Sequence, residues 1–203
     1  MAIYAESAPA ANHTPAPEGT HCARCVSMVD LGTQKNTFDP SKPDRRMVRI
    51  SFELADELRE DGKPFLVSQK FALSMHEKSS LRKQLQSWRG KPFTEEQAKR
   101  FDISVLLGIP CLLNVIHSTK EGGKTYANIA SLSPLVKGMS APAQVTPTLE
   151  FSLEAGDFDQ LVYESLPDFL KEEIAASPEY QARQAPATVL EAVTAEEENG
   201  LPF

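Results

Sequence analysis

Alternation of apolar and polar residues over two neighbouring segments restricts the possible folds of this sequence more than any other feature. Every second residue is apolar in residues 46–54, and residues 64–76 continue the same alternation. The turn signal Asp61-Gly62 lies between the two segments. A period of two residues is typical of a half-buried β-strand. The pattern therefore predicts two long strands joined by a tight connection.

Three further segments have the composition of strands: residues 21–30, 111–118 and 124–132. Between the third and fourth strands the period changes, because Leu81, Leu85 and Trp88 recur on one face of a helix over residues 78–89. Three strands, a helix and two strands are the elements of an OB-fold in chain order. We therefore expect a mainly β chain: an OB-fold-like five-stranded barrel with a helix between strands three and four, plus disordered tails.

Charge is divided unevenly along the chain. Residues 141–203 contain two basic and thirteen acidic residues, a net charge of −11, whereas residues 1–140 have a net charge of +4. Composition predicts a flexible N-terminal arm over residues 1–19, a binding domain over residues 20–140, and an acidic, largely disordered tail over residues 141–203. Within that tail, only short segments around Phe151 and residues 168–176 are compatible with docked structure.

A basic body with an acidic tail is the polarity expected of a nucleic-acid-binding protein. Single-stranded DNA requires cations for its phosphates and flat rings on which bases stack, and an OB-fold presents them around strands two and three. Phe52, Phe71 and Trp88 are expected in the core, because each lies on an apolar stripe. The residues predicted to bind DNA are Arg45, Arg46, Arg49, Lys70, Arg89, Lys91, His117, Lys120, Lys124 and Tyr126.

The last eight residues join an acidic run to an apolar tripeptide that carries the terminal carboxylate. They are Glu196, Glu197, Glu198, Asn199, Gly200, Leu201, Pro202 and Phe203. This ending resembles the C-terminal tip of bacterial single-stranded-DNA-binding proteins, an acidic run that ends in Pro-Phe. The resemblance implies that Glu196–Glu198 and Leu201–Phe203 dock on replication and repair proteins while the body coats DNA.

Segments of the body resemble proteins from the replication and recombination regions of tailed phages. These segments are residues 78–83, 87–94, 106–111 and 126–131. The resemblance covers residues 20–140 and carries no established catalytic motif. It agrees with a role in DNA maintenance. Together with the tip, it implies a phage-encoded single-stranded-DNA-binding protein that acts in the cytoplasm of a bacterial host. Its partners would be single-stranded DNA and host or phage replication and recombination proteins. A homo-oligomer is compatible with this prediction.

No catalytic, cofactor or metal motif is complete in this sequence. Residues 122–125, Gly-Gly-Lys-Thr, match the end of a phosphate loop, but Ser118 stands where its first glycine belongs. Cys22 and Cys25 form a Cys-x-x-Cys pair without a second pair at the spacing of a zinc site. We therefore expect a protein that is not an enzyme and holds no cofactor or metal. The absence of a signal peptide and of a run of about 20 apolar residues predicts a cytoplasmic protein.

A different class of function remains open, because the net charge of the body is only +4. In that alternative the protein is an interaction adaptor, or an inhibitor of a host replication protein, and its acidic tail mimics DNA. Reversal of the charges of Arg49 and Lys124 should abolish binding to DNA in the first case and have little effect in the second.

Overall fold

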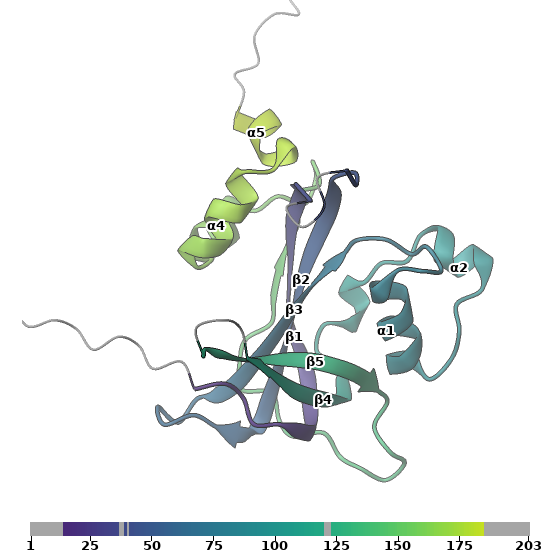
Figure 1. Ribbon diagram of the computed structural model, residues 1–203, viewed down its shortest axis with the longest axis vertical. Helices are drawn as coiled ribbons and strands as arrows, with labels where there is room; N and C mark the ends of the chain where they lie inside the picture. The colour runs from purple at the N-terminus through teal and green to yellow at the C-terminus, as the bar shows by residue number, and fades with distance from the viewer. Residues whose placement is uncertain (1–13, 37–38, 40, 120–122, 185–203) are drawn as a thin grey trace, which may run out of the picture.

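The computed structural model describes residues 14–36, 39, 41–119 and 123–184, and its main element is a six-stranded sheet (Figure 1). The hydrogen-bonded order is β3-β2-β1-β4-β5 with antiparallel neighbours, and β6 pairs in parallel with β1. The strands are β1 (Gly19–Gln34), β2 (Arg45–Leu58), β3 (Pro64–Ala72), β4 (Pro110–Thr119), β5 (Thr125–Ser133) and β6 (Leu149–Phe151). The prediction of a mainly β chain is confirmed.

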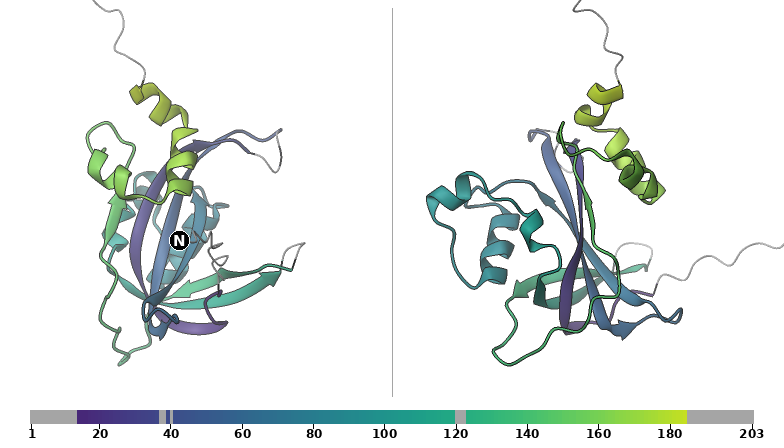
Figure 2. Two further views of the ribbon diagram at one scale, coloured as in Figure 1. Left: turned by 90° about the vertical axis from the view of Figure 1, so that its left-hand side faces the viewer. Right: turned by 180° about the vertical axis from the view of Figure 1, so that it is seen from behind.

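Short helices lie on the two sides of the long strands β1–β3 (Figure 2). On one side, α1 (Ser80–Arg89), α2 (Glu95–Lys99) and the 3-10 turn η1 (Ser104–Leu106) connect β3 to β4. On the other side, α3 (Gln160–Ser165), α4 (Asp168–Ala175) and α5 (Pro178–Gln184) follow β6. Within the described residues, no helix is both long and apolar enough to span a membrane.

The sheet is open where the expected barrel would close. β3 and β5 are the two ends of the hydrogen-bonded order, and no ladder joins them in the described part of the chain. The β4–β5 hairpin instead crosses the long strands at a steep angle (Figure 1). Two irregularities in the pairing of β1 with β2, at Cys25/Ser27 and at Asp30/Gly32, accompany the bending of the sheet.

The inner face of the long strands holds the main core. Val48, Ile50, Phe52 and Leu54 of β2 are buried there with Val67 and Phe71 of β3, as the alternation predicts. Helix α1 covers this face with Leu81, Leu85 and Trp88, and the Trp88 ring packs edge-on against Phe52 with 5.5 Å between centroids. Gly90 ends α1 in the left-handed conformation. The assignment of Phe52, Phe71 and Trp88 to the core is confirmed.

Residues 149–184 are folded, contrary to the prediction of a largely disordered tail. They form β6 and α3–α5 and bury apolar side chains against the outer face of β1. The physical reason is that Val29 and Leu31 of β1 point away from the main core and need apolar partners from elsewhere in the chain. The resulting second cluster consists of Val29, Leu31, Phe151, Leu153, Leu166, Leu170 and Ile174.

Part of the expected N-terminal arm also packs on the body. Ala16 is buried in the main core, and β1 begins at Gly19. The ring Nε2 of His117 lies 2.7 Å from the carbonyl oxygen of Ala16, which fixes these residues beside β4. Residues 1–13 of the arm lie outside the described residues, as do Lys120 and the whole C-terminal tip.

Candidate nucleic-acid interface

The outer face of β2 and β3 carries the cations that the sequence places on strands two and three. Arg49 of β2 lies directly opposite Lys70 of β3, and the neighbouring pair is Ser51 with Ser68. The hydroxyl of Ser68 donates to Ser51 at 2.9 Å. Two like charges opposite each other across strands are destabilising unless a counter-ion lies between them.

Helix α4 supplies that counter-ion. Lys70 Nζ donates to the carboxylate of Glu173, and the same carboxylate acts on Arg49. Burial lowers the pKa of Arg49, and the charge of Glu173 opposes this effect only in part. One turn earlier on α4, the ring of Phe169 lies 5.4 Å from the guanidinium carbon of Arg49. The expected DNA-binding strands are therefore partly covered by the C-terminal segment.

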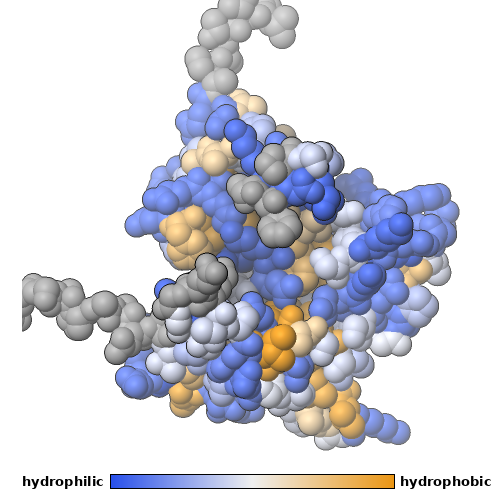
Figure 3. Space-filling view, viewed as in Figure 1, coloured by the Kyte–Doolittle hydropathy of each residue, from blue (hydrophilic) through white to orange (hydrophobic). Residues whose placement is uncertain are grey.

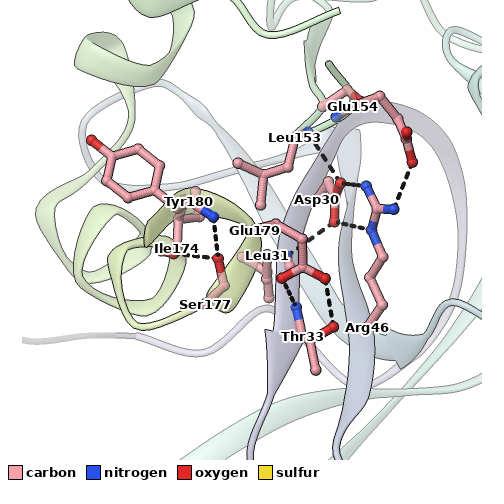
Figure 4. A network of polar contacts seen from close by, with 12 residues as sticks. Asp30, Leu31, Thr33, Arg46, Leu153, Glu154, Ile174, Ser177, Glu179 and Tyr180 are labelled. Carbon is pink, nitrogen blue, oxygen red and sulfur yellow. Dashed lines mark hydrogen bonds and ion pairs between the residues drawn. The ribbon is translucent and has the colours of Figure 1, made fainter. Parts of the chain in front are cut away.

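Arg46 is part of a partly buried ionic network and is not a free surface cation (Figure 4). Its guanidinium forms an ion pair with Asp30 of β1 and a second one with Glu154, at 2.6 Å. The hydrogen bonds to Asp30 raise the pKa of Arg46 further above its ordinary value. Asp30 also accepts from the amides of Gly32, at 3.0 Å, and Leu153, at 3.1 Å. Arg46 thus joins β1, β2 and the segment after β6, whereas its neighbour Arg45 is exposed.

The β4–β5 hairpin presents a second group of predicted residues. Lys124 is exposed, and its Nζ lies 5.6 Å from the ring centroid of Tyr126. The backbone amide of His117 donates to Glu18 at 2.7 Å, so His117 holds the residues that precede β1. Lys124 and Tyr126 are the described residues of this hairpin that combine a cation with a ring.

Arg89 and Lys91 lie apart from both groups, at the end of α1. The guanidinium of Arg89 packs over Phe93, 4.1 Å from the ring centroid, and lies 5.6 Å from that of Phe101. Phe93 is buried, so the alternation of rings and cations from Trp88 to Phe93 mainly builds the core beside α1. Lys91 is exposed.

A groove on the outer face brings two of the predicted residues together. Arg49 of β2 and Tyr126 of β5 both line it, although they come from distant parts of the chain. The other described residues of the predicted set do not line it: Arg45, Arg46, Lys70, Arg89, Lys91, His117 and Lys124. Further lining comes from Ser51, Leu66 and Ser68 of the long strands, from Asn128 of β5, from the charged residues Arg59, Glu60, Asp61 and Glu150, and from Ser165, Leu166, Pro167, Phe169 and Leu170.

Phe169 is the lining residue that the sequence prediction missed. An apolar patch lies over α4 in Figure 3 among hydrophilic neighbours, and Phe169 is the large apolar residue of this helix that is exposed. A signal for it exists in the sequence, because Leu166, Leu170 and Ile174 recur every four residues. Such a stripe predicts a docked helix, and Phe169 lies off the stripe.

The cysteines and acidic residues do not form a metal site in the described residues. No group of three or more His, Cys, Asp or Glu residues there could hold a metal ion. Cys25 and Cys111 are buried, and burial raises the pKa of Cys25 to about 12. A thiol with so high a pKa is not ionised at neutral pH and is a poor nucleophile.

Neither a protein-family model nor a curated protein sequence matches this chain.

Proposed function

We propose that this protein binds single-stranded DNA without sequence preference, in the groove on the outer face of β2 and β3. The observation that carries the proposal is that Arg49 and Tyr126 line one groove. Phosphate neutralisation needs the cation, and base stacking needs the ring. Exposed Lys124, beside Tyr126, adds a second positive charge at the edge of this site.

The order of the elements supports an OB-fold-like body in this proposal. An OB-fold has its helix between strands three and four and binds oligonucleotides on the face around strands two and three. Here α1 follows β3, β1 lies between β2 and β4, and β3 and β5 are the free ends. The proposed groove lies on the outer face of β2 and β3, the surface on which OB-folds in general bind oligonucleotides.

The proposed role is in DNA replication and recombination of a phage in a bacterial cytoplasm. It rests on the likeness of the body to proteins from the replication and recombination regions of tailed phages, and on the likeness of the tip to bacterial single-stranded-DNA-binding proteins. In this proposal Glu196–Glu198 and Leu201–Phe203 recruit replication proteins, while the groove binds DNA. The two tasks are therefore assigned to separate parts of the chain.

Titration of fluorescein-labelled oligo(dT) with the purified full-length protein, at low and at high salt, tests the proposal. We expect salt-sensitive binding that is tighter for oligo(dT) than for duplex DNA of the same length. The double variant Arg49→Glu with Lys124→Glu should bind roughly tenfold more weakly or worse, because it reverses two charges at the site. Lys83→Glu with Lys137→Glu is the matched control, since it makes the same change of net charge at exposed residues outside the groove.

A second candidate function is favoured by the apolar part of the groove lining. Leu58 and Leu66 are exposed there, and an exposed apolar groove is also typical of a site for a protein segment. In that case the protein is an interaction adaptor. No binding of oligo(dT) at low salt, or equal effects of the two charge-reversal variants, would contradict DNA binding in the groove and favour the adaptor.

A further inference from the structure

We infer that Phe169 of α4 is a stacking platform for a base, so that the folded C-terminal segment is part of the nucleic-acid site. This inference rests on the proposed function. Residues 149–184 then contribute to DNA binding and do not have to leave the groove before DNA enters. Phe169 would instead contact the DNA from its docked position.

The exposure of Phe169 contrasts with the burial of the other large apolar residues of its helix. Leu170 and Ile174 of α4 are buried in the second cluster, whereas 54% of Phe169 is exposed to solvent. Successive residues of a helix point about 100° apart, so a helix docked through Leu170 turns Phe169 to its flank. That flank faces the groove, and Phe169 lines it together with Arg49 and Tyr126.

Phe169 and Arg49 together supply the two groups that single-stranded DNA requires. The guanidinium carbon of Arg49 lies over the ring of Phe169, 5.4 Å from its centroid. A base that stacked on this ring would bring its phosphate close to a cation that is already in place. Arg49 is also partly withdrawn from water, which strengthens its attraction for a phosphate.

The helix that carries Phe169 is held firmly against the strands. Glu173 accepts from Lys70 through its carboxylate, and its backbone carbonyl accepts from the side-chain amide of Gln34 at 2.9 Å. These contacts, with Leu170 and Ile174 in the second cluster, fix α4 relative to β1 and β3. A ring on a fixed helix loses little conformational freedom when it binds a base, so stacking on it is favourable.

Three variants of the full-length protein test the inference in the oligo(dT) titration. Phe169→Ala should weaken binding roughly 5- to 100-fold, the range for loss of one stacked base, without changing the salt dependence, because no cation is lost. Phe169→Trp should keep wild-type affinity, and oligo(dT) should quench its fluorescence. The wild-type protein is the control for this quenching, because its single tryptophan, Trp88, is 4% exposed and so is shielded from oligo(dT). Leu161→Ala is the matched control: Leu161, on α3, is 77% exposed and does not line the groove.

The outcomes separate this inference from the proposed function. If Phe169→Ala binds as the wild type does, while Arg49→Glu with Lys124→Glu has lost binding, the stacking role is wrong and DNA binding in the groove stands. If neither variant changes binding, both are wrong. A thermal unfolding curve of each variant checks its fold, and unquenched Phe169→Trp fluorescence in a variant that is folded and saturated with oligo(dT) also overturns the stacking role.

Discussion

The two faces of the long strands β1–β3 are buried in different ways. The inner face is covered by α1, which follows β3 in the chain, and by β4 and β5, and its core is mainly apolar. The outer face mixes apolar residues with charges, and their partners are distant in sequence: Glu154 is 108 residues from Arg46, and Glu173 is 103 residues from Lys70. The stability of the inner face therefore depends on how well apolar side chains fill its core. The stability of the outer face depends on specific ion pairs and hydrogen bonds with residues that are distant in sequence.

Buried carboxylates show this difference most clearly. Glu53 of β2 has no exposed surface, and its carboxylate accepts from the backbone amides of Val145, at 2.8 Å, and Thr146. Asp30 is satisfied in part by the amide of Leu153. A buried charge that loses its partners is strongly destabilising. Residues after β5 are thus required to satisfy polar groups on the strands as well as to cover apolar ones.

The largest expected loss of stability comes from truncation of a side chain on the inner face. Phe52→Ala removes a fully buried ring that contacts Trp88, and such truncations cost about 3–5 kcal/mol. Urea unfolding followed by circular dichroism should show this loss as a single shifted transition. Phe169→Ala, the same truncation at an exposed position, should change stability by about 0.5 kcal/mol or less. Equal losses for the two variants would contradict the assignment of Phe52 to a close-packed core.

A smaller loss of stability is expected where the C-terminal segment packs against the outer face of β1. Gly32 has a φ of +69°, and a Cβ there would lie 2.5 Å from the Cβ and Oγ of Ser177. Gly62 has a φ of +75° with no atom within 4 Å of such a Cβ. Both Gly→Ala variants incur the backbone strain, but only Gly32→Ala also pushes α5 away. We expect Gly32→Ala to be about 1–3 kcal/mol less stable than Gly62→Ala.

Hydrogen exchange should locate that loss. Gly32→Ala is expected to raise exchange selectively in peptides from residues 149–184, because the crowding lies between β1 and the C-terminal segment. Peptides from the inner strands should keep their protection. Raised exchange throughout the chain would mean that the two faces unfold as one unit, and the comparison between them would then fail.

The sequence predicts the inner face well because its signals are local. Alternation over 46–54 and 64–76 locates β2 and β3, and the spacing of Leu81, Leu85 and Trp88 locates α1. The C-terminal segment is different. Its net acidic charge predicts disorder, although its docking depends on Val29 and Leu31, more than a hundred residues earlier. A stripe of apolar residues shows that a helix can dock, but it does not show which surface receives it.

The residues of the candidate site also fall into those that the sequence predicts and those that depend on contacts distant in sequence. Arg49 and Tyr126 lie on the polar parity of their strands, which the sequence shows, and both line the groove. Arg46 and Lys70 are equally basic in the sequence, but Glu154 and Glu173 hold them in ion pairs. Phe169 enters the groove only because α4 is docked. A residue type indicates what a side chain can bind, whereas its availability depends on contacts that are distant in sequence.

The smallest expected effect concerns a single carboxylate that attaches α5 to β1. Glu179 accepts from the amide of Thr33 at 2.8 Å and from its hydroxyl at 2.6 Å (Figure 4). Burial alone would raise the pKa of Glu179, but these hydrogen bonds outweigh it and hold the pKa below the ordinary value of 4.5. The stabilisation is therefore present above pH 4.5 and is lost as the pH falls through the lowered pKa.

Glu179→Gln should be less stable than the wild type by no more than about 1 kcal/mol at neutral pH. In urea unfolding measured over a series of pH values, that difference should shrink as the solution becomes acidic. A difference that stayed constant with pH would show that the Glu179 charge does not contribute to holding α5 on β1.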